Sequence, residues 1–251
     1  LLHSLEPGPL VTLDVVHVDN HLLLVAKPAG LPIVPDASGD AALSELAKAW
    51  IAREYHKPGA VFLGVVHRLD RPVSGVVCFA RTSKAAARLT EAFKQRRVEK
   101  VYLGLGVGAW PEGRPPEGEL RQWLWKDKRR NRVHAWNSEG AAPPEAKVAV
   151  TRYRRLAGDG RRQLLRLEPH TGRSHQLRLA ARELGVPLAG DLRYGEGLEP
   201  LADRSIGLHA LRLVLPHPTL KDELAFHADL PAGPWWDPWR DVDVDGPALS
   251  T

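Results

Sequence analysis

The chain has 251 residues, of which 43% are hydrophobic and 26% charged, values that suit one large globular domain or two small ones. No apolar stretch approaches the roughly 18 residues of a membrane span, so we expect no membrane association. The formal net charge is +5, and most of the 35 basic residues are arginine. This bias favours a nucleic-acid partner, although a GC-rich genome gives the same composition.

The cysteine usage and the N-terminus indicate where the protein works. The single cysteine, Cys78, excludes an internal disulfide and a cysteine zinc site, and its apolar neighbours predict that it is buried. The first ten residues lack the basic and apolar regions of a signal peptide. We therefore expect a cytoplasmic protein.

The first half of the chain predicts strands that alternate with loops and two helices. In chain order, we predict strands over 13–18 and 22–26, a loop over 27–40, a helix near 41–55, strands on either side of residues 67–75, a helix that begins at Ser83, and a strand over 101–107. Ser83 is a favourable N-cap residue. In the last strand, Val101, Leu103 and Leu105 share one face and Tyr102 lies on the other.

The second half predicts mostly strands. They are two strands joined by a basic turn within 123–136, strands near 146–156 and 163–168, a helix from about Ser174 to Leu184, and a last strand over 209–215. Strands outnumber helices and show no βαβ rhythm. The fold class that follows is α+β, a single mixed domain built on a largely antiparallel sheet flanked by helices.

Several familiar site patterns are incomplete in this chain. The glycines of GLGVG (104–108) follow a strand, but no helix can begin in the proline-rich segment after them, which excludes a dinucleotide loop. No pair of histidines has the spacing of a zincin, so we expect no metal site. Ser74 lacks the preceding glycine of a nucleophile elbow, which leaves a hydrolase triad unsupported.

The stretch HRLDRPVSG (67–75) places Asp70 between Arg68 and Arg71 at a junction of two strands. This arrangement has two interpretations. It is either a surface ion pair or a carboxylate held ionised for chemistry.

Two basic segments suggest contacts with an anion. Residues 123–136 combine three tryptophans with a turn that contains Lys128, Arg129 and Arg130, a composition that suits RNA contact. A solvated turn explains the charges equally well, and burial in the core is the favoured interpretation of the tryptophans. In GRSHQLR (172–178), arginines near a helix N-terminus oppose the helix dipole. They indicate an anionic partner unless they are ordinary surface residues.

Together these stretches resemble a known family. HRLDRPVSG and the segment 170–195 are similar to the signature of the RluA-type pseudouridine synthases, and the segments 20–35, 98–108 and 206–218 resemble further family motifs in the same order. The resemblance covers roughly residues 13–218. Val73 stands where relatives often have threonine. Few residues precede the first motif, so we expect no separate N-terminal RNA-binding domain.

The resemblance implies an RNA enzyme that isomerises a uridine to pseudouridine after base flipping, without cofactor or metal. It implies that Asp70 is the catalytic carboxylate, either as a nucleophile towards the sugar or as the base that removes a 2′ proton. Arg173 matches the arginine that pairs with this acid. Tyr102 matches the tyrosine that stacks on the base and helps to remove its carbon-5 proton. Arg68 matches the arginine that fills the gap left by the flipped nucleotide.

The remaining expectations concern binding and boundaries. Ile206 and Leu208 wall the uracil pocket or merely pack their strand, and His67, Leu69 and Ser74 support the loop. Lys128, Arg129 and Arg130 contact RNA. We expect a catalytic domain over 13–235, flexible or peripheral termini over 1–12 and 236–251, a monomer, and a structured ribosomal or transfer RNA as partner. The sequence leaves open which uridine is modified.

Two other functions remain open at this stage. One is a catalytically idle RNA-binding or chaperone protein that keeps the fold, against which the presence of Asp70, Tyr102 and Arg173 argues. The other is a nucleoside hydrolase or glycosylase, which would release free uracil instead of rejoining it to the sugar.

Overall fold

The structure, a computed structural model, describes residues 13–220 and 222–248. Its strands are β1 (Asp14–Val18), β2 (Leu22–Lys27), β3 (Gly64–Val65), β4 (Ser74–Ala80), β5 (Glu99–Val107), β6 (Glu117–Asp127), β7 (Arg132–Trp136), β8 (Lys147–Gly158), β9 (Arg162–Pro169), β10 (Leu208–Pro216) and β11 (Glu223–His227). Its helices are α1 (Leu43–Glu54), α2 (Ser83–Lys94) and α3 (Gln176–Glu183), with short 3₁₀ turns η1 (Glu139–Ala141) and η2 (Asp237–Trp239).

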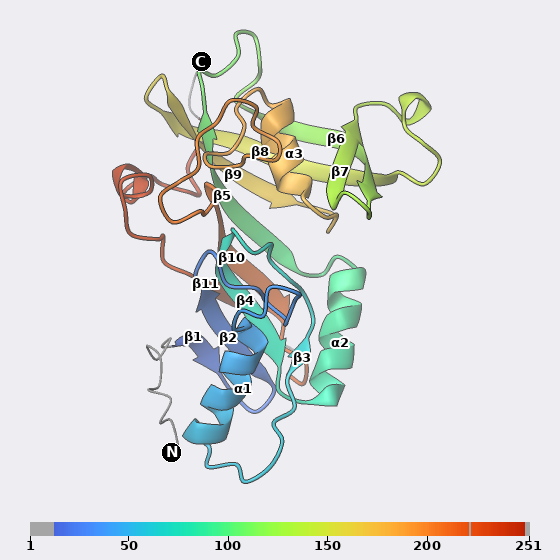
Figure 1. Ribbon diagram of the computed structural model, residues 1–251, viewed down its shortest axis with the longest axis vertical. Coiled ribbons are helices and arrows are strands. Elements are labelled where there is room, and N and C mark those ends of the chain that lie inside the picture. Colours follow the sequence, from blue (N-terminus) through green and yellow to red (C-terminus); the bar gives the residue numbers. More distant parts are fainter. Residues whose placement is uncertain (1–12, 221, 249–251) are drawn as a thin grey trace, which may run out of the picture.

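All eleven strands belong to one sheet, whose main path runs β1-β2-β4-β10-β5-β9-β8-β6-β7. Among the described strands, the pairing of β4 with β10 is parallel and the other pairings are antiparallel. Figure 1 shows α1 and α2 beside the half that contains β1, β2 and β4, and α3 over the half that contains β8 and β6. The predicted α+β fold with a largely antiparallel sheet is confirmed.

Alternation along the strands divides the core into two faces. In β4, Val77 and Phe79 point into a cluster with residues of α1 and α3, whereas Val76 and Cys78 point into a cluster with α2. Helices α1 and α3 therefore cover the same face of the sheet, and α2 covers the opposite face. Cys78 is fully buried, as its neighbours predict.

Some boundaries differ from the expected ones. The N-cap of α2 is Thr82, whose side chain accepts a hydrogen bond from Ala85 N at 3.1 Å, so Ser83 is already the first helical residue. The apolar run before residue 67 forms only the two-residue strand β3. Strand β11 follows the strand that was expected to be the last, and it pairs with β10. None of the helices in the described ranges is long and apolar enough to span a membrane.

The expectation that residues 236–251 are peripheral is wrong for the part that the structure describes. Trp236 and Trp239 are buried against Leu103, Leu105 and other residues of β5 and β9. Asp245 accepts hydrogen bonds from Arg166 and Arg212. The segment covers sheet surface that the helices leave open, which explains why its tryptophans are buried. The expectations for residues 1–12 and 249–251 lie outside the described residues.

Candidate active site

The loop between β3 and β4 carries Asp70 and is fastened on several sides. Gly30 N donates to Arg71 O at 2.8 Å, and the Arg71 side chain donates in return to Gly30 O at 2.8 Å. Ile206 N donates to Pro72 O at 3.1 Å. The neighbour Leu69 is buried in the main core. The loop is therefore held in one conformation, while the Asp70 side chain stays 37% exposed and accessible to a substrate.

A buried lysine lies beneath this loop. Lys27 is 2% exposed, and its Nζ donates to Pro28 O, Leu31 O and Arg71 O at 2.9, 2.8 and 3.0 Å. Burial lowers the pKa of Lys27 to about 7; the charge of Asp70 opposes this shift and that of Arg71 adds to it. The lysine joins the loop at 28–31 to the loop that carries Asp70.

Strand register brings Tyr102 to the same region. Ala210 of β10 is paired with Gly75 of β4 on one side and with Tyr102 of β5 on the other. Gly75 has φ +120°, and a Cβ there would meet Ala210 O at 2.3 Å, so only glycine permits this approach. Burial raises the pKa of Tyr102 above its usual value, and the charge of Asp70 raises it further. The phenol is thus protonated at neutral pH and lies within the field of Asp70.

The start of α3 is fixed by hydrogen bonds to β8. Gln176 Nε2 donates to Val150 O and to Thr151 Oγ1, both at 2.9 Å, and Gln176 Oε1 accepts from Thr171 Oγ1 at 2.7 Å. His175 precedes the helix in the left-handed region, with φ +54°. The left-handed turn and the Gln176 contacts set the direction in which the first residues of α3 point.

Two side chains of this segment face the Asp70 carboxylate. Arg178 Nη1 lies 3.6 Å from Asp70 Oδ2, and His175 Nε2 lies 3.8 Å from the same oxygen. Arg178 is itself held by Asp191, which accepts from Nε at 2.7 Å and from Nη2 at 2.6 Å. Burial lowers the pKa of Arg178, but the hydrogen bonds and charge of Asp191 outweigh burial, so the net shift is upward. A permanent cation therefore stands beside Asp70.

The expected pairing of Arg173 with Asp70 is not found. Arg173 lies in the turn before α3, its side chain is exposed, and its Nε donates to Val148 O at 3.0 Å. The arginine that faces Asp70 is Arg178, two residues into the helix. The arginine beside Asp70 thus comes from the predicted motif, but it is Arg178 and not Arg173.

His175 connects Asp70 to the β6–β7 hairpin. Its Nδ1 lies 2.6 Å from Tyr194 Oη, and Tyr194 Oη accepts from Val133 N at 3.0 Å. Burial lowers the pKa of His175 to about 4 against the opposing effect of Asp70, and the charges of Arg178, Arg193 and Lys126 lower it further. The imidazole is therefore neutral at pH 7. One hydrogen is shared between Nδ1 and Tyr194 Oη, and in the tautomer in which Tyr194 donates it, the ring hydrogen is on Nε2 and faces Asp70.

The other expected site residues fall into two groups. Ile206 and Leu208 are each 4% exposed and belong to the core cluster that contains Leu69, with Tyr102 packed against that cluster. Arg68 is exposed, and its side chain has no hydrogen bond or ion pair to any described residue. The exposed Lys128, Arg129 and Arg130 form the β6–β7 turn.

Two supporting residues have specific contacts. Ser74 Oγ lies 2.9 Å from Nδ1 of the buried His209 on β10, and His67 Nε2 accepts from Cys78 N at 2.8 Å. Both contacts connect the ends of the loop to neighbouring strands. Within residues 13–220 and 222–248, no group of three or more histidine, cysteine, aspartate or glutamate side chains is placed to hold a metal ion.

Comparison with known proteins identifies the family. Residues 21–183, which include both Asp70 and Arg178, match the RNA pseudouridylate synthase family. The chain belongs to this family, and its relatives place it with the RluA type.

Relatives match over most of the chain. The ribosomal large subunit pseudouridine synthase C of Vibrio cholerae is 31% identical over 87% of this chain and 66% of its own length. An uncharacterised RNA pseudouridine synthase of Zymomonas mobilis is 34% identical over 80% of this chain and 87% of its own. The structure of human RNA pseudouridylate synthase domain containing 1 superposes with a TM-score of 0.66 at 30% identity, over 88% of this chain and 85% of its own. The chain spans about two thirds of the Vibrio relative.

Proposed function

We propose that this chain isomerises a specific uridine of a structured ribosomal or transfer RNA to pseudouridine. Family membership gives the reaction class, and the contact of Arg178 with Asp70 is the observation that carries the assignment. A half-exposed carboxylate beside a permanent cation is placed to act on a substrate as a nucleophile or as a base. A protein that only binds RNA gains nothing from a carboxylate at this place, because the negative charge of the carboxylate repels phosphates.

The reaction needs a carboxylate and no external reactant. The bond from uracil N1 to ribose C1′ breaks, and the base turns and forms a bond from C5 to the same carbon. C5 then loses its proton to solvent and N1 takes one up, so the atoms balance and nothing is oxidised. Asp70 starts this sequence, either by attack on C1′ or by removal of a 2′ proton. Arg178, itself fixed by two hydrogen bonds to Asp191, lies 3.6 Å from the carboxylate and orients it.

Tyr102 serves mainly to stack on the uracil and is not an ionised base. Because its phenol is protonated at neutral pH, its ring offers a stacking surface for the uracil. A protonated Tyr102 can accept the C5 proton only after it has given its phenolic proton to another group. Asp70 is the charged group that acts on the pKa of this phenol. Ile206 and Leu208 form the apolar wall beneath the base, and the exposed Arg68 takes the place of the extruded nucleotide in the RNA stack.

Product analysis tests this proposal. Purified protein is incubated with uridine-labelled ribosomal and transfer RNA, and the RNA is digested to nucleosides. We expect pseudouridine and no free uracil. Release of uracil would indicate a glycosylase, and binding without either product would indicate a catalytically idle RNA-binding protein. Comparing several RNAs also identifies the substrate.

The same proposal includes action in the cytoplasm and as a monomer, which fractionation and sedimentation test separately.

A further inference from the structure

The β6–β7 hairpin carries a row of aromatic rings on one face. Trp125 is paired with His134, and Trp123 with Trp136, so all four side chains point to the same side of the hairpin. The rings of Trp125 and His134 are 5.9 Å apart at 36°, and those of His134 and Trp136 are 6.2 Å apart at 35°. The rings thus form a continuous, gently tilted surface.

The three tryptophans of the hairpin are not core residues, contrary to the favoured interpretation of the sequence. The opposite face of the hairpin supplies the core, through Leu124 and Val133, which pack with Leu179 and Tyr194 of the catalytic half. Trp125 is 36% exposed, and neither it nor Trp136 belongs to a cluster of buried residues in the described chain. The hydrophobic effect alone does not explain large rings kept at the surface.

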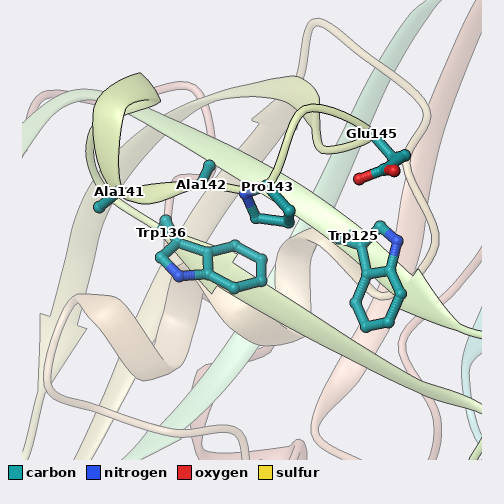
Figure 2. Close-up of a pocket in the computed structure, with 6 residues that line it drawn as sticks. All are labelled: Trp125, Trp136, Ala141, Ala142, Pro143 and Glu145. Atoms are coloured by element: carbon teal, nitrogen blue, oxygen red, sulfur yellow. The ribbon is translucent and has the colours of Figure 1, made fainter.

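A hollow of about 540 Å³ adjoins this row, lined by Trp125, Trp136, Ala141, Ala142, Pro143 and Glu145. Figure 2 shows Pro143 between the two indoles in this view, with the Glu145 carboxylate near Trp125. The lining is flat and mostly apolar, with one acceptor at its edge. Such a surface suits a planar, partly polar group, such as a nucleobase with an exocyclic amino or imino hydrogen.

The charge around the hollow favours a polyanion over a peptide. Residues 121–136 contain six lysines and arginines and one acid, Asp127. Asp127 is already engaged, because its Oδ1 accepts from Arg129 N at 2.9 Å and from Arg130 N at 3.1 Å. A proline-rich peptide also binds between tryptophans, but it has no need of this positive charge. In a single-stranded nucleic acid, the bases can stack on the aromatic rings while the phosphates contact the basic side chains.

The hairpin also adjoins the catalytic site on its other face. Lys126 lies close enough to His175 to lower the pKa of that histidine, and Val133 N donates to Tyr194, which bonds His175. Arg193 donates to Asn131 O in the turn. To reach the aromatic row from Asp70, an RNA strand has to pass around an edge or the end of the hairpin, and the basic turn forms that end.

We infer that Trp125, His134 and Trp136, with the hollow beside Pro143, form a stacking subsite for one or two unpaired nucleotides that flank the target uridine. This inference rests on the proposed function, because it places the flanking strand relative to Asp70. The basic turn holds the phosphates, and the rings hold the bases.

RNAs that differ only in their flanking bases test the subsite. One labelled ten-residue single strand carries bases throughout, and a second keeps the same phosphates but has a base only at its central uridine. Binding is measured by fluorescence anisotropy. Wild-type protein is expected to bind the first RNA on the order of tenfold more tightly than the second. Trp125→Leu combined with Trp136→Leu should bind both RNAs alike, and near the weaker value.

Trp235→Leu is the matched control, since Trp235 is a half-buried tryptophan of the C-terminal segment that packs with Trp236 and Trp239. It should keep the wild-type preference, and circular dichroism checks that each variant is folded. An equal loss of affinity for both RNAs in the double variant, or no loss, would overturn the subsite. So would competition by a proline-rich peptide at the same residues.

Pseudouridine formation by the wild-type protein is read in a separate assay. Its absence would contradict the proposed function and leave the binding result standing. A wild-type protein that makes pseudouridine but binds both RNAs alike would contradict the subsite alone.

Discussion

The surroundings of Asp70 and the β6–β7 turn use arginine in opposite ways. Arg178 is 7% exposed and held by two hydrogen bonds to Asp191, so its position is fixed before any substrate arrives. The side chains of Arg129 and Arg130 are exposed, and the only described ion pair there joins Arg130 to Asp127 at 3.9 Å. Fixed charges suit catalysis, because they need no reorganisation during the reaction. Exposed, adaptable charges suit attraction of a polyanion, which salt weakens.

Substitution of the fixed arginine should give the largest effect among the basic residues. Arg178→Lys keeps a positive charge but loses the fork that bonds Asp191 while a third nitrogen faces Asp70. We expect the single-turnover rate to fall by about a hundredfold, typical of the loss of one preorganised charged partner. RNA affinity should change little.

Arg173→Lys is the matched control, because it changes the neighbouring arginine of the same motif. Its rate should fall by no more than a few-fold, since its side chain bonds Val148 O and not Asp70. Losses of similar size in the two variants would remove the distinction between Arg178 and Arg173.

Lys27 extends the comparison to a buried cation beneath the loop. Its native pKa of about 7 is below its usual value, so between pH 7 and 10 the unfolded chain binds more protons than the native one. The free energy of unfolding therefore rises with pH in this window because of Lys27. Lys27→Met should remove a rise of about 2 kcal/mol between pH 7 and 9. Urea unfolding of both proteins at the two pH values measures it, and identical slopes would show that Lys27 keeps its proton.

Arg68 lies between the two regions, exposed yet two residues from Asp70. If it replaces the flipped nucleotide, Arg68→Ala should slow modification most on a stem-loop, where extrusion of a base costs roughly a few kcal/mol. An unstructured RNA with the same uridine should be modified with a smaller defect. Single-turnover rates on the two RNAs decide the matter. Equal defects would make Arg68 a support of the carboxylate instead.

The basic turn should show the smallest effect, one confined to affinity. Replacement of Lys128, Arg129 and Arg130 by alanine removes up to three phosphate contacts. The slope of log affinity against log salt should become shallower by about 2. Replacement of Lys48, Arg53 and Lys57, which are exposed on and after α1, is the control and should leave the slope unchanged. The reverse result would place the RNA on the other side of the molecule.

The sequence predicted the elements whose side chains follow a clear period. Strands β1, β2, β4, β5 and β7 to β10 and the three helices lie close to their expected ranges, because alternation and helical spacing there reflect burial on two faces. Strand β6 begins at Glu117, earlier than the expected start at residue 123. Strand β11 was missed because five residues after a loop carry too short a pattern. The burial of Trp236 depends on contact with β5 and β9, which are distant in the sequence.

The sequence predicted the central residue of the candidate site, Asp70, but not the arginine that faces it. Asp70 stands out within a nine-residue motif, but the choice between Arg173 and Arg178 depends on where α3 begins. The left-handed conformation of His175 delays the helix to Gln176 and turns Arg173 away. The hydrogen bond from Arg178 to Asp191, which also identifies Arg178 as the fixed arginine, joins two residues that no local sequence pattern connects. The hairpin tryptophans were misjudged because alternation does not reveal which face of a sheet stays uncovered.

The central claim is that the charge of Asp70 drives the isomerisation, and Asp70→Asn tests it most directly because it removes the charge and keeps the shape. RNA labelled with tritium at uridine C5 is mixed with excess protein, and tritium release is followed in a single turnover. RNA affinity is measured in parallel. We predict no release above the uncatalysed background, with affinity within a few-fold of the wild type. Release at a rate within about tenfold of the wild type would contradict the account.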